Sequence, residues 1–187
     1  VHLHRIVAIS VVLRVKDELK VLSLGEETST EAELVKKFFD GIERYQPTLV
    51  SWNGGGFDLP VLNFRALRHG VVAKTYWDTG HFDRDSKWNS YIGRYQFRHT
   101  DLMDVLALYQ GRNNAPLHEV AQMLGFPGQL GMDGSQVYPA WRAGKIADIL
   151  ACFETDVMNT WLIYLPFQLL RRPLSPTDHE PEPAVPP

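Results

Sequence analysis

The chain has 187 residues and a formal net charge of −3, and 44% of the residues are hydrophobic. This length predicts one domain with a sizeable apolar core. The charge lacks the basic surplus of most nucleic-acid binders, although enzymes that bind metal ions through carboxylates are often acidic. The single cysteine, Cys152, excludes an internal disulfide, and there is no apolar run of about 18 residues. We therefore expect a cytoplasmic protein without a membrane span. The first residue is Val1 rather than Met, which is consistent with a fragment.

Strand and helix patterns alternate through the first part of the chain. A continuous β-branched run at 6–13 is typical of a strand that is buried on both faces. Ser29 or Thr30 can cap a helix whose apolar spacing continues to Tyr45, before Pro47. The predicted strands are residues 6–13, 19–24 and 48–52, and a second helix is predicted over about 60–69.

The second part of the chain begins with an irregular segment, residues 71–99, that contains seven aromatic residues. These either stack on nucleobases or pack in the core and in loops. Further elements are predicted at 101–109, 117–124 and about 143–170, with a loop at 126–134. Residues 173–187 are rich in proline and acidic residues and predict a disordered tail, so the domain is expected to span residues 1–172.

This order of elements predicts an α/β fold, a mixed sheet with flanking helices. Many functions share that architecture, so function has to be argued from particular residues. The most informative stretch runs from Asn53 to Asp58, where three glycines follow a predicted strand and precede a helix. Glycines allow close approach to the backbone, and a carboxylate at a strand end is well placed for a divalent cation. A glycine turn with Asp58 as a helix cap, or a phosphate-cradling loop, are the alternatives.

The last predicted helix carries a second carboxylate, Asp156. Cys152, Asp156 and Asn159 lie at i, i+4 and i+7, on a stripe beside the apolar stripe of the helix. Asp156 can therefore point toward the sheet end that carries Asp58, or it is a solvated helix residue. Cys152 has no histidine near it in the sequence, so a small buried apolar residue is the favoured interpretation over a nucleophile.

The stretch Asn53–Leu62 resembles the second exonuclease motif of family B DNA polymerase proofreading domains, Asn-x-x-x-Phe-Asp. Cys152–Thr160 resembles their third motif, Tyr-x-x-x-Asp, with cysteine in the tyrosine position. The segments His99–Leu106 and Leu124–Ser135 resemble a stand-alone bacterial subgroup of predicted 3′–5′ exonucleases. The resemblance covers about residues 3–172 and implies a ribonuclease H-like fold of the DEDDy type.

The resemblance also implies roles for individual residues. It implies that Asp58 and Asp156 are metal ligands in a site for two Mg²⁺ or Mn²⁺ ions, and that Asn53 and Phe57 face the 3′-terminal nucleotides. Cys152 would occupy the catalytic tyrosine position, although its thiol is shorter and a weaker donor. The family gives Asp101 and Asp104 no primary metal role, so capping or structural carboxylates are expected there.

The first motif of that family, Asp-x-Glu on the first central strand, has no counterpart in a strand of this chain. Its only match, Asp178–Glu180, lies in the proline-rich tail. Two carboxylates are expected to hold at most one divalent ion, and weakly. The edge of the 6–13 strand would then lack a neighbour, and we expect a partner chain, a rearranged segment or a homodimer to cover it.

Three functions remain open from the sequence. The first is a 3′–5′ exonuclease that hydrolyses nucleic acid, with DNA the favoured substrate, from its 3′ ends. The second is a catalytically inactive relative that binds single-stranded ends or a protein partner. The third is a scaffold whose aromatic residues at 76–97 dock another protein.

Overall fold

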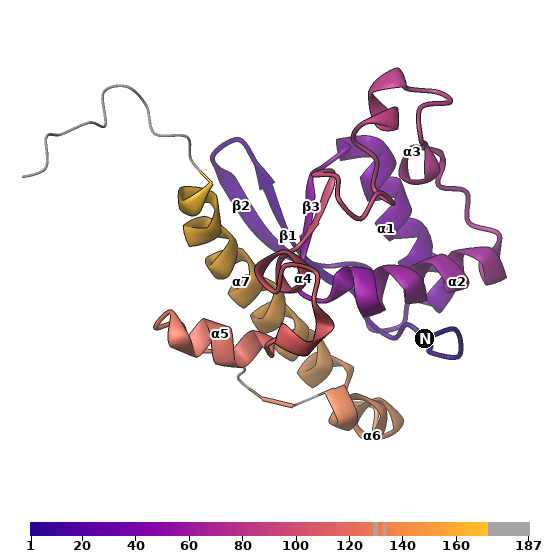
Figure 1. Ribbon diagram of the computed structural model, residues 1–187. Helices are drawn as coiled ribbons and strands as arrows, with labels where there is room; N and C mark the ends of the chain where they lie inside the picture. The colour runs from indigo at the N-terminus through magenta and orange to yellow at the C-terminus, as the bar shows by residue number, and fades with distance from the viewer. Residues whose placement is uncertain (129–130, 133, 172–187) are drawn as a thin grey trace, which may run out of the picture.

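The structure is a computed structural model that describes residues 1–128, 131–132 and 134–171. It contains four short strands and seven α-helices within these residues (Figure 1). The strands are β1 (Ser10–Val15), β2 (Glu18–Ser23), β3 (Leu49–Ser51) and β4 (His99–Asp101). The helices are α1 (Glu31–Tyr45), α2 (Leu59–His69), α3 (Lys74–Trp77), α4 (Leu102–Leu106), α5 (Leu117–Met123), α6 (Val137–Arg142) and α7 (Ile146–Leu170).

The strands are paired two by two. Strands β1 and β2 form an antiparallel hairpin, and β3 and β4 form a parallel pair in which Ser51 lies opposite Asp101. Within the described residues no ladder joins the hairpin to the parallel pair. The predicted α/β class is therefore confirmed, whereas the single mixed sheet is replaced by two separate pairs. The ribonuclease H-like arrangement stays a prediction.

The first strand lies further along the chain than its apolar run predicts. The predicted strand spans residues 6–13, but β1 spans Ser10–Val15, because β2 pairs only with those residues. The preceding residues are held by other contacts: Ile6 donates its N–H to the Glu31 carboxylate at 2.7 Å. Every residue from 6 to 13 is at least partly buried, and β2 is the only strand that pairs with β1 in the described chain.

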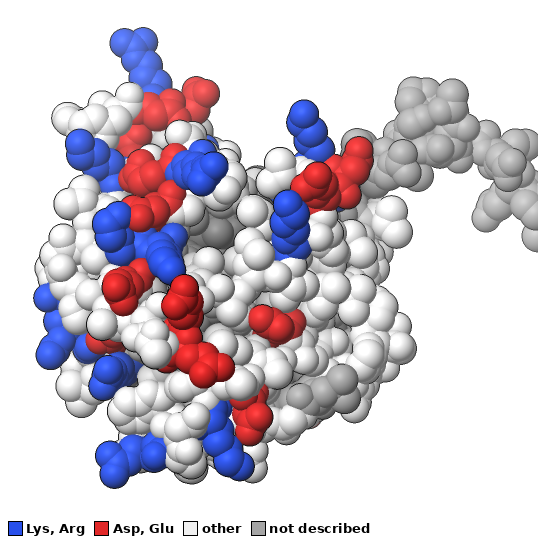
Figure 2. Space-filling model, turned by 180° about the vertical axis from the view of Figure 1, so that it is seen from behind, with Lys and Arg blue, Asp and Glu red and all other residues white. Residues whose placement is uncertain are grey.

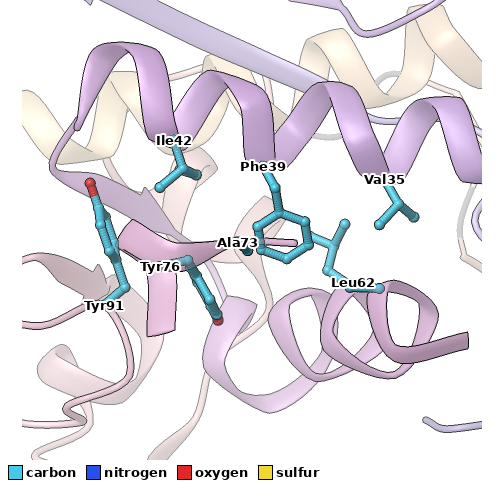
Figure 3. Packing of buried hydrophobic residues seen from close by; sticks show 8 residues of the cluster. Val35, Phe39, Ile42, Leu62, Ala73, Tyr76 and Tyr91 are labelled. Carbon is cyan, nitrogen blue, oxygen red and sulfur yellow. The ribbon is translucent and has the colours of Figure 1, made fainter. Parts of the chain in front are cut away.

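Helices cover the strands from two sides (Figure 1). On one side α1, α2 and α3 enclose an apolar cluster, in which Phe39 and Ile42 of α1 face Leu62 of α2 and Tyr76 of α3 (Figure 3). On the other side α7 packs along β1 and β3. Because Leu49 of β3 joins the α1–α2 cluster and the next residue joins the α7 cluster, β3 lies between the two layers.

The aromatic segment, residues 71–99, divides between core and surface. Tyr76 and Tyr91 are buried and stack on each other at 5.8 Å between ring centroids. Five other aromatic residues of the segment are exposed: Trp77, Phe82, Trp88, Tyr95 and Phe97. Both packing and surface exposure thus occur in one segment, and base stacking by the exposed rings stays a prediction.

The C-terminal part of the described chain differs from the prediction mainly at one additional helix. Helix α7 ends at Leu170, as predicted, but begins at Ile146, and the short helix α6 precedes it. The predicted tail, 173–187, lies outside the described residues. No helix in the described part of the chain has the length and apolar character needed to cross a membrane.

Candidate functional site

The Asn53–Asp58 segment leaves the end of β3 and turns directly into a helix. Asn53 adopts a left-handed backbone conformation (φ 61°), and Gly54–Asp58 form one wide π-helical turn that continues into α2. Asp58 makes no side-chain capping bond to α2. The interpretation of Asp58 as an ordinary helix cap is therefore wrong, and its carboxylate is available for another role.

The three glycines of this segment are explained by neighbouring side chains. A Cβ atom on Gly54 would lie 2.3 Å from the Ser51 Oγ, and one on Gly56 would lie 2.4 Å from the Asn53 Oδ1. A Cβ atom on Gly55 would lie 3.3 Å from a carboxylate oxygen of Asp101. The predicted close approach to the backbone is thus present, and the groups that approach are the protein's own side chains.

Side chains of strand β4 form hydrogen bonds with this segment and with the end of β3. Asp101 accepts hydrogen bonds from the backbone N–H of Asn53 and of Gly55, each at 2.8 Å. The Ser51 hydroxyl and the His99 Nε2 are hydrogen-bonded at 2.8 Å. These contacts follow from the parallel pairing, because the C-terminal ends of β3 and β4 meet at one edge. Asp101 is structural, as the sequence predicts, but its partners are on a distant segment.

The Asp58 carboxyl group has a raised pKa. Although Asp58 is an exposed residue, the protein surrounding its carboxyl group raises the pKa, the nearby negative charge of Asp101 raises it further, and the resulting pKa is about 6. Among the described residues Asp58 has no cationic partner. A bound cation would therefore favour the ionised form of this group.

Asn53 and Phe57, the predicted substrate-binding residues, are both exposed. Phe57 has 41% of its surface accessible, and its ring forms a T-shaped pair with the His4 ring at 5.1 Å between centroids. Asn53 lines a cleft of about 570 Å³, a size typical of ligand sites. The cleft continues past Gly55 and Gly56 to the aromatic segment, where Tyr95 and Phe97 line it. Asp58 and Asp156 do not line this cleft.

Asp156 lies on the most buried stripe of α7, not beside it. The buried residues of this helix are Ile149, Cys152, Asn159, Ile163 and Phe167. Their spacing of three, seven, four and four places Asp156 in the middle of the stripe, where it is partly buried. Burial raises the pKa of Asp156, and no cation pairs with it in the described chain. The predicted position at the edge of the packed face is thus wrong.

The two buried polar residues of this stripe, Cys152 and Asn159, donate to backbone carbonyl oxygens outside the helix. Cys152 is 5% exposed, and its thiol donates to the Met132 carbonyl oxygen at 3.0 Å. Asn159 donates to the Gly128 carbonyl oxygen at 2.7 Å. Burial raises the pKa of the Cys152 thiol, and the charge of Asp156 adds to this effect. Cys152 is thus a buried packing residue, and a catalytic role for it stays a prediction.

The two candidate metal ligands come from separate elements. Over the described residues, no group of three or more His, Cys, Asp or Glu side chains is close enough to hold a metal ion. Asp58 and Asp156 offer the hard oxygen donors that Mg²⁺ and Mn²⁺ prefer, and their raised pKa values indicate carboxylates that lack compensating charge. The donor chemistry fits a divalent ion, but the described side chains supply only part of a site.

Surface charge gives no broad basic band on the face turned toward the viewer in Figure 2. Lys and Arg side chains are interspersed there with Asp and Glu side chains (Figure 2). Local cation–aromatic contacts are present instead, such as Arg94 over the Tyr109 ring at 5.5 Å beside the cleft. The face shown in Figure 2 therefore carries no wide positive surface of the kind that attracts nucleic acid electrostatically.

A family model described as "Predicted 3'-5' exonuclease related to the exonuclease domain of PolB" matches residues 1–185. Comparisons with curated proteins and with solved structures found no match.

Proposed function

Because the chain belongs to the family of predicted 3′–5′ exonucleases related to the PolB exonuclease domain, we propose that it removes nucleotides from the 3′ ends of nucleic acid, and that this nucleic acid is DNA. The observation that carries the proposal is the position of Asp58. It stands on a helical turn at the end of a parallel strand, without a cationic partner in the described residues, and the same segment lines a cleft.

The reaction would be hydrolysis of the terminal phosphodiester. Water attacks the phosphorus atom, the bond to the 3′ oxygen of the preceding nucleotide breaks, and a nucleoside 5′-monophosphate leaves. When bound, divalent ions would activate the water and stabilise the leaving oxygen. We propose that Asp58 and Asp156 hold Mg²⁺ or Mn²⁺ through their carboxylate oxygens, and that complete two-metal activity needs further carboxylates.

Asn53 and Phe57 would orient the terminal nucleotides. The exposed Phe57 ring offers an apolar face on which a base can stack, and Asn53, which lines the cleft, offers an amide donor and acceptor. In this arrangement the glycine segment supplies both the metal ligand and the substrate contacts. A shift of that segment would therefore affect binding and hydrolysis together.

The test is degradation of a 5′-labelled single-stranded oligonucleotide by the purified protein with Mn²⁺. Asp58→Asn should abolish the ladder of shortened products, while Asp40→Asn, an exposed carboxylate paired with Lys36 on α1, should leave it unchanged. An RNA oligonucleotide of the same sequence distinguishes the two substrates. Degradation that survives Asp58→Asn, or that also occurs in EDTA, would refute the assignment.

A second candidate is a catalytically inactive relative that binds 3′ ends. Cys152 favours it, because this residue fills the tyrosine position of the third motif but is buried and bonded to the Met132 carbonyl oxygen. An inactive binder would retain the labelled strand in a gel-shift experiment without shortening it. Loss of that binding in Phe57→Ala, together with absence of hydrolysis in the wild type, would support this second function.

We also propose that the protein forms a homodimer through the hairpin. Within the described residues β1 pairs only with β2, so no strand pairs with its other edge, and β2 exposes Leu19, Val21 and Leu22. Unpaired strand edges are places where a second chain adds. Light scattering coupled to size-exclusion chromatography measures the mass directly. A monomer at all concentrations tested would exclude this assembly.

A further inference from the structure

We propose that Asp101 is a positioning residue, which holds the Asn53–Asp58 segment in the shape that presents Asp58. The effect on hydrolysis rests on the proposed function, whereas the effect on the segment does not. Asp101 belongs to β4, and it is separated from the two residues it holds by 48 and 46 positions in the sequence.

Both carboxylate oxygens of Asp101 are used. Oδ1 accepts from the Asn53 N–H and Oδ2 accepts from the Gly55 N–H, each at 2.8 Å, and the residue is only 8% exposed. No Lys or Arg of the described chain pairs with this buried carboxylate. The two amide donors therefore provide its main stabilisation, as charge-assisted hydrogen bonds.

These two amides, on the N-cap residue Asn53 and on Gly55, lie at the N-terminus of a helix, where backbone donors have no partner within the helix. A side chain at the N-cap position usually satisfies one of them, but Asn53 makes no such bond. Asp101, which lies on strand β4, performs this capping function instead and accepts hydrogen bonds from two donors. It caps the turn in place of Asn53, the residue at the N-cap position.

The residues around Asp101 support its role in holding the Asn53–Asp58 segment. The Ser51–His99 hydrogen bond fastens the residue two positions before Asn53 to the same strand, β4. The neighbouring acid, Asp104, pairs instead with Arg94 at 3.1 Å. Gly55 is close to Asp101 because it lacks a side chain. Asp58 follows three residues later within the same helical turn, so a displaced Gly55 would displace Asp58.

The first test measures amide hydrogen exchange in the whole protein by NMR. Asp101→Asn keeps the shape but turns an NH₂ group toward one of the two donors. We expect exchange at Asn53 and Gly55 to accelerate at least about tenfold. Asp104→Asn, which removes a charge from the adjacent helix, should leave both amides protected. Wild-type protection at both amides in Asp101→Asn would overturn the proposal.

The second test separates positioning from the proposed function. With Mn²⁺ and the labelled oligonucleotide, Asp101→Asn should lower kcat about 100-fold with a smaller change in KM, because Asp58 is displaced from the reacting phosphate. Asp101→Glu keeps the charge and should recover part of kcat. If Asp101→Asn does not fold, Asp101→Glu provides the test. Reduced amide protection and a reduced kcat in Asp101→Glu would support the proposal, and wild-type amide protection with wild-type kcat would refute it.

The outcomes distinguish two failures. If the wild type does not hydrolyse the oligonucleotide but Asp101→Asn still exposes the Asn53 and Gly55 amides, the exonuclease assignment fails and the capping role of Asp101 stands. If the wild type is active and Asp101→Asn keeps its kcat despite faster exchange, the positioning role in catalysis is refuted.

Discussion

The carboxyl group of Asp58 is crowded by surrounding protein and also lies within reach of the negative charge of Asp101, so that its pKa is about 6. An unfolded chain would give an aspartate pKa of about 3.9. The folded protein therefore binds this proton more tightly than the unfolded chain does. The stability that protonated Asp58 contributes is fully present below pH ~4 and is lost as the pH rises through about 6.

We expect Asp58→Asn to raise the thermal stability of the metal-free protein at pH 7, because an amide carries no charge that the surroundings oppose. The advantage over the wild type should shrink as the pH falls from 7 toward 4. Thermal denaturation in EDTA across this range measures the difference. Wild-type stability that equals or exceeds that of Asp58→Asn at pH 7 would contradict the raised pKa.

The buried ion-pair cluster around Glu31 has a pKa shift in the opposite direction, so the expected dependence of stability on pH is also opposite. Its carboxylate is 6% exposed and bonds to the Arg65 guanidinium, to His69 at 2.9 Å and to the Ile6 N–H at 2.7 Å. Burial alone would raise its pKa, but the hydrogen bonds from Arg65, His69 and Ile6 outweigh it, and the pKa is about 2. Glu31 therefore stabilises the fold above pH ~4, and this contribution is lost as the pH falls toward 2.

Glu31→Gln should lower the free energy of unfolding by about 3 kcal/mol at pH 7, because it leaves Arg65 buried without its counter-charge. Urea denaturation at pH 7 and pH 3 provides the measurement, and the loss should be smaller at pH 3. Glu27→Gln, at an exposed position, is the matched control. Equal losses at both pH values would argue against the low pKa of Glu31.

The glycines of the Asn53–Asp58 segment provide a third prediction. In Gly54→Ala the new methyl group would lie 2.3 Å from the Ser51 Oγ, so Ser51 or the turn must move. We expect a loss of about 1–3 kcal/mol in the free energy of unfolding. Gly41→Ala is the control, because it lies within α1 with no atom near its Cβ position, and it should stabilise by about 0.5–1 kcal/mol. A neutral Gly54→Ala would contradict the close packing.

Cys152 provides the fourth prediction. Tyrosine at this position would restore the pattern of the third motif, but the site is buried against the Met132 carbonyl. Cys152→Tyr should therefore destabilise the protein by about 1–3 kcal/mol and should not increase nuclease activity. Cys152→Ser, nearly the same size, should keep wild-type activity. A faster Cys152→Tyr enzyme would show that the helix can reorient and that the catalytic position is accessible.

Local patterns predicted much of this structure. The glycines after the β3 run gave the position of the motif, and Thr30 forms the capping box with Glu33 that begins α1. What escaped prediction depends on contacts between distant segments. The bonds of Asp101 to Asn53 and Gly55 require the pairing of β3 with β4, which no local pattern contains. Likewise, the start of β1 depends on the extent of its pairing with β2.

The long helix shows a second physical limit. Apolar periodicity predicts that the isoleucines and phenylalanines of this helix are buried and that its polar residues lie outside the core. Cys152 and Asn159 are nevertheless buried, because they donate to the backbone carbonyl oxygens of Met132 and Gly128. Asp156 lies between these two residues on the same side of the helix and is partly buried, and this burial raises the pKa of its carboxyl group. A hydrophobicity pattern cannot contain these bonds, because the acceptors belong to another segment.

The three glycines and the bonds of Asp101 have a consequence for protein engineering. The shape of Asn53–Asp58 depends on Ser51 and on the pair His99 and Asp101, which approach it from a strand nearly 50 residues away. Transplanting the short motif alone into another scaffold would leave two amides without an acceptor and a turn without lateral support. A functional graft would need both strand ends together, as a two-part cassette in parallel register.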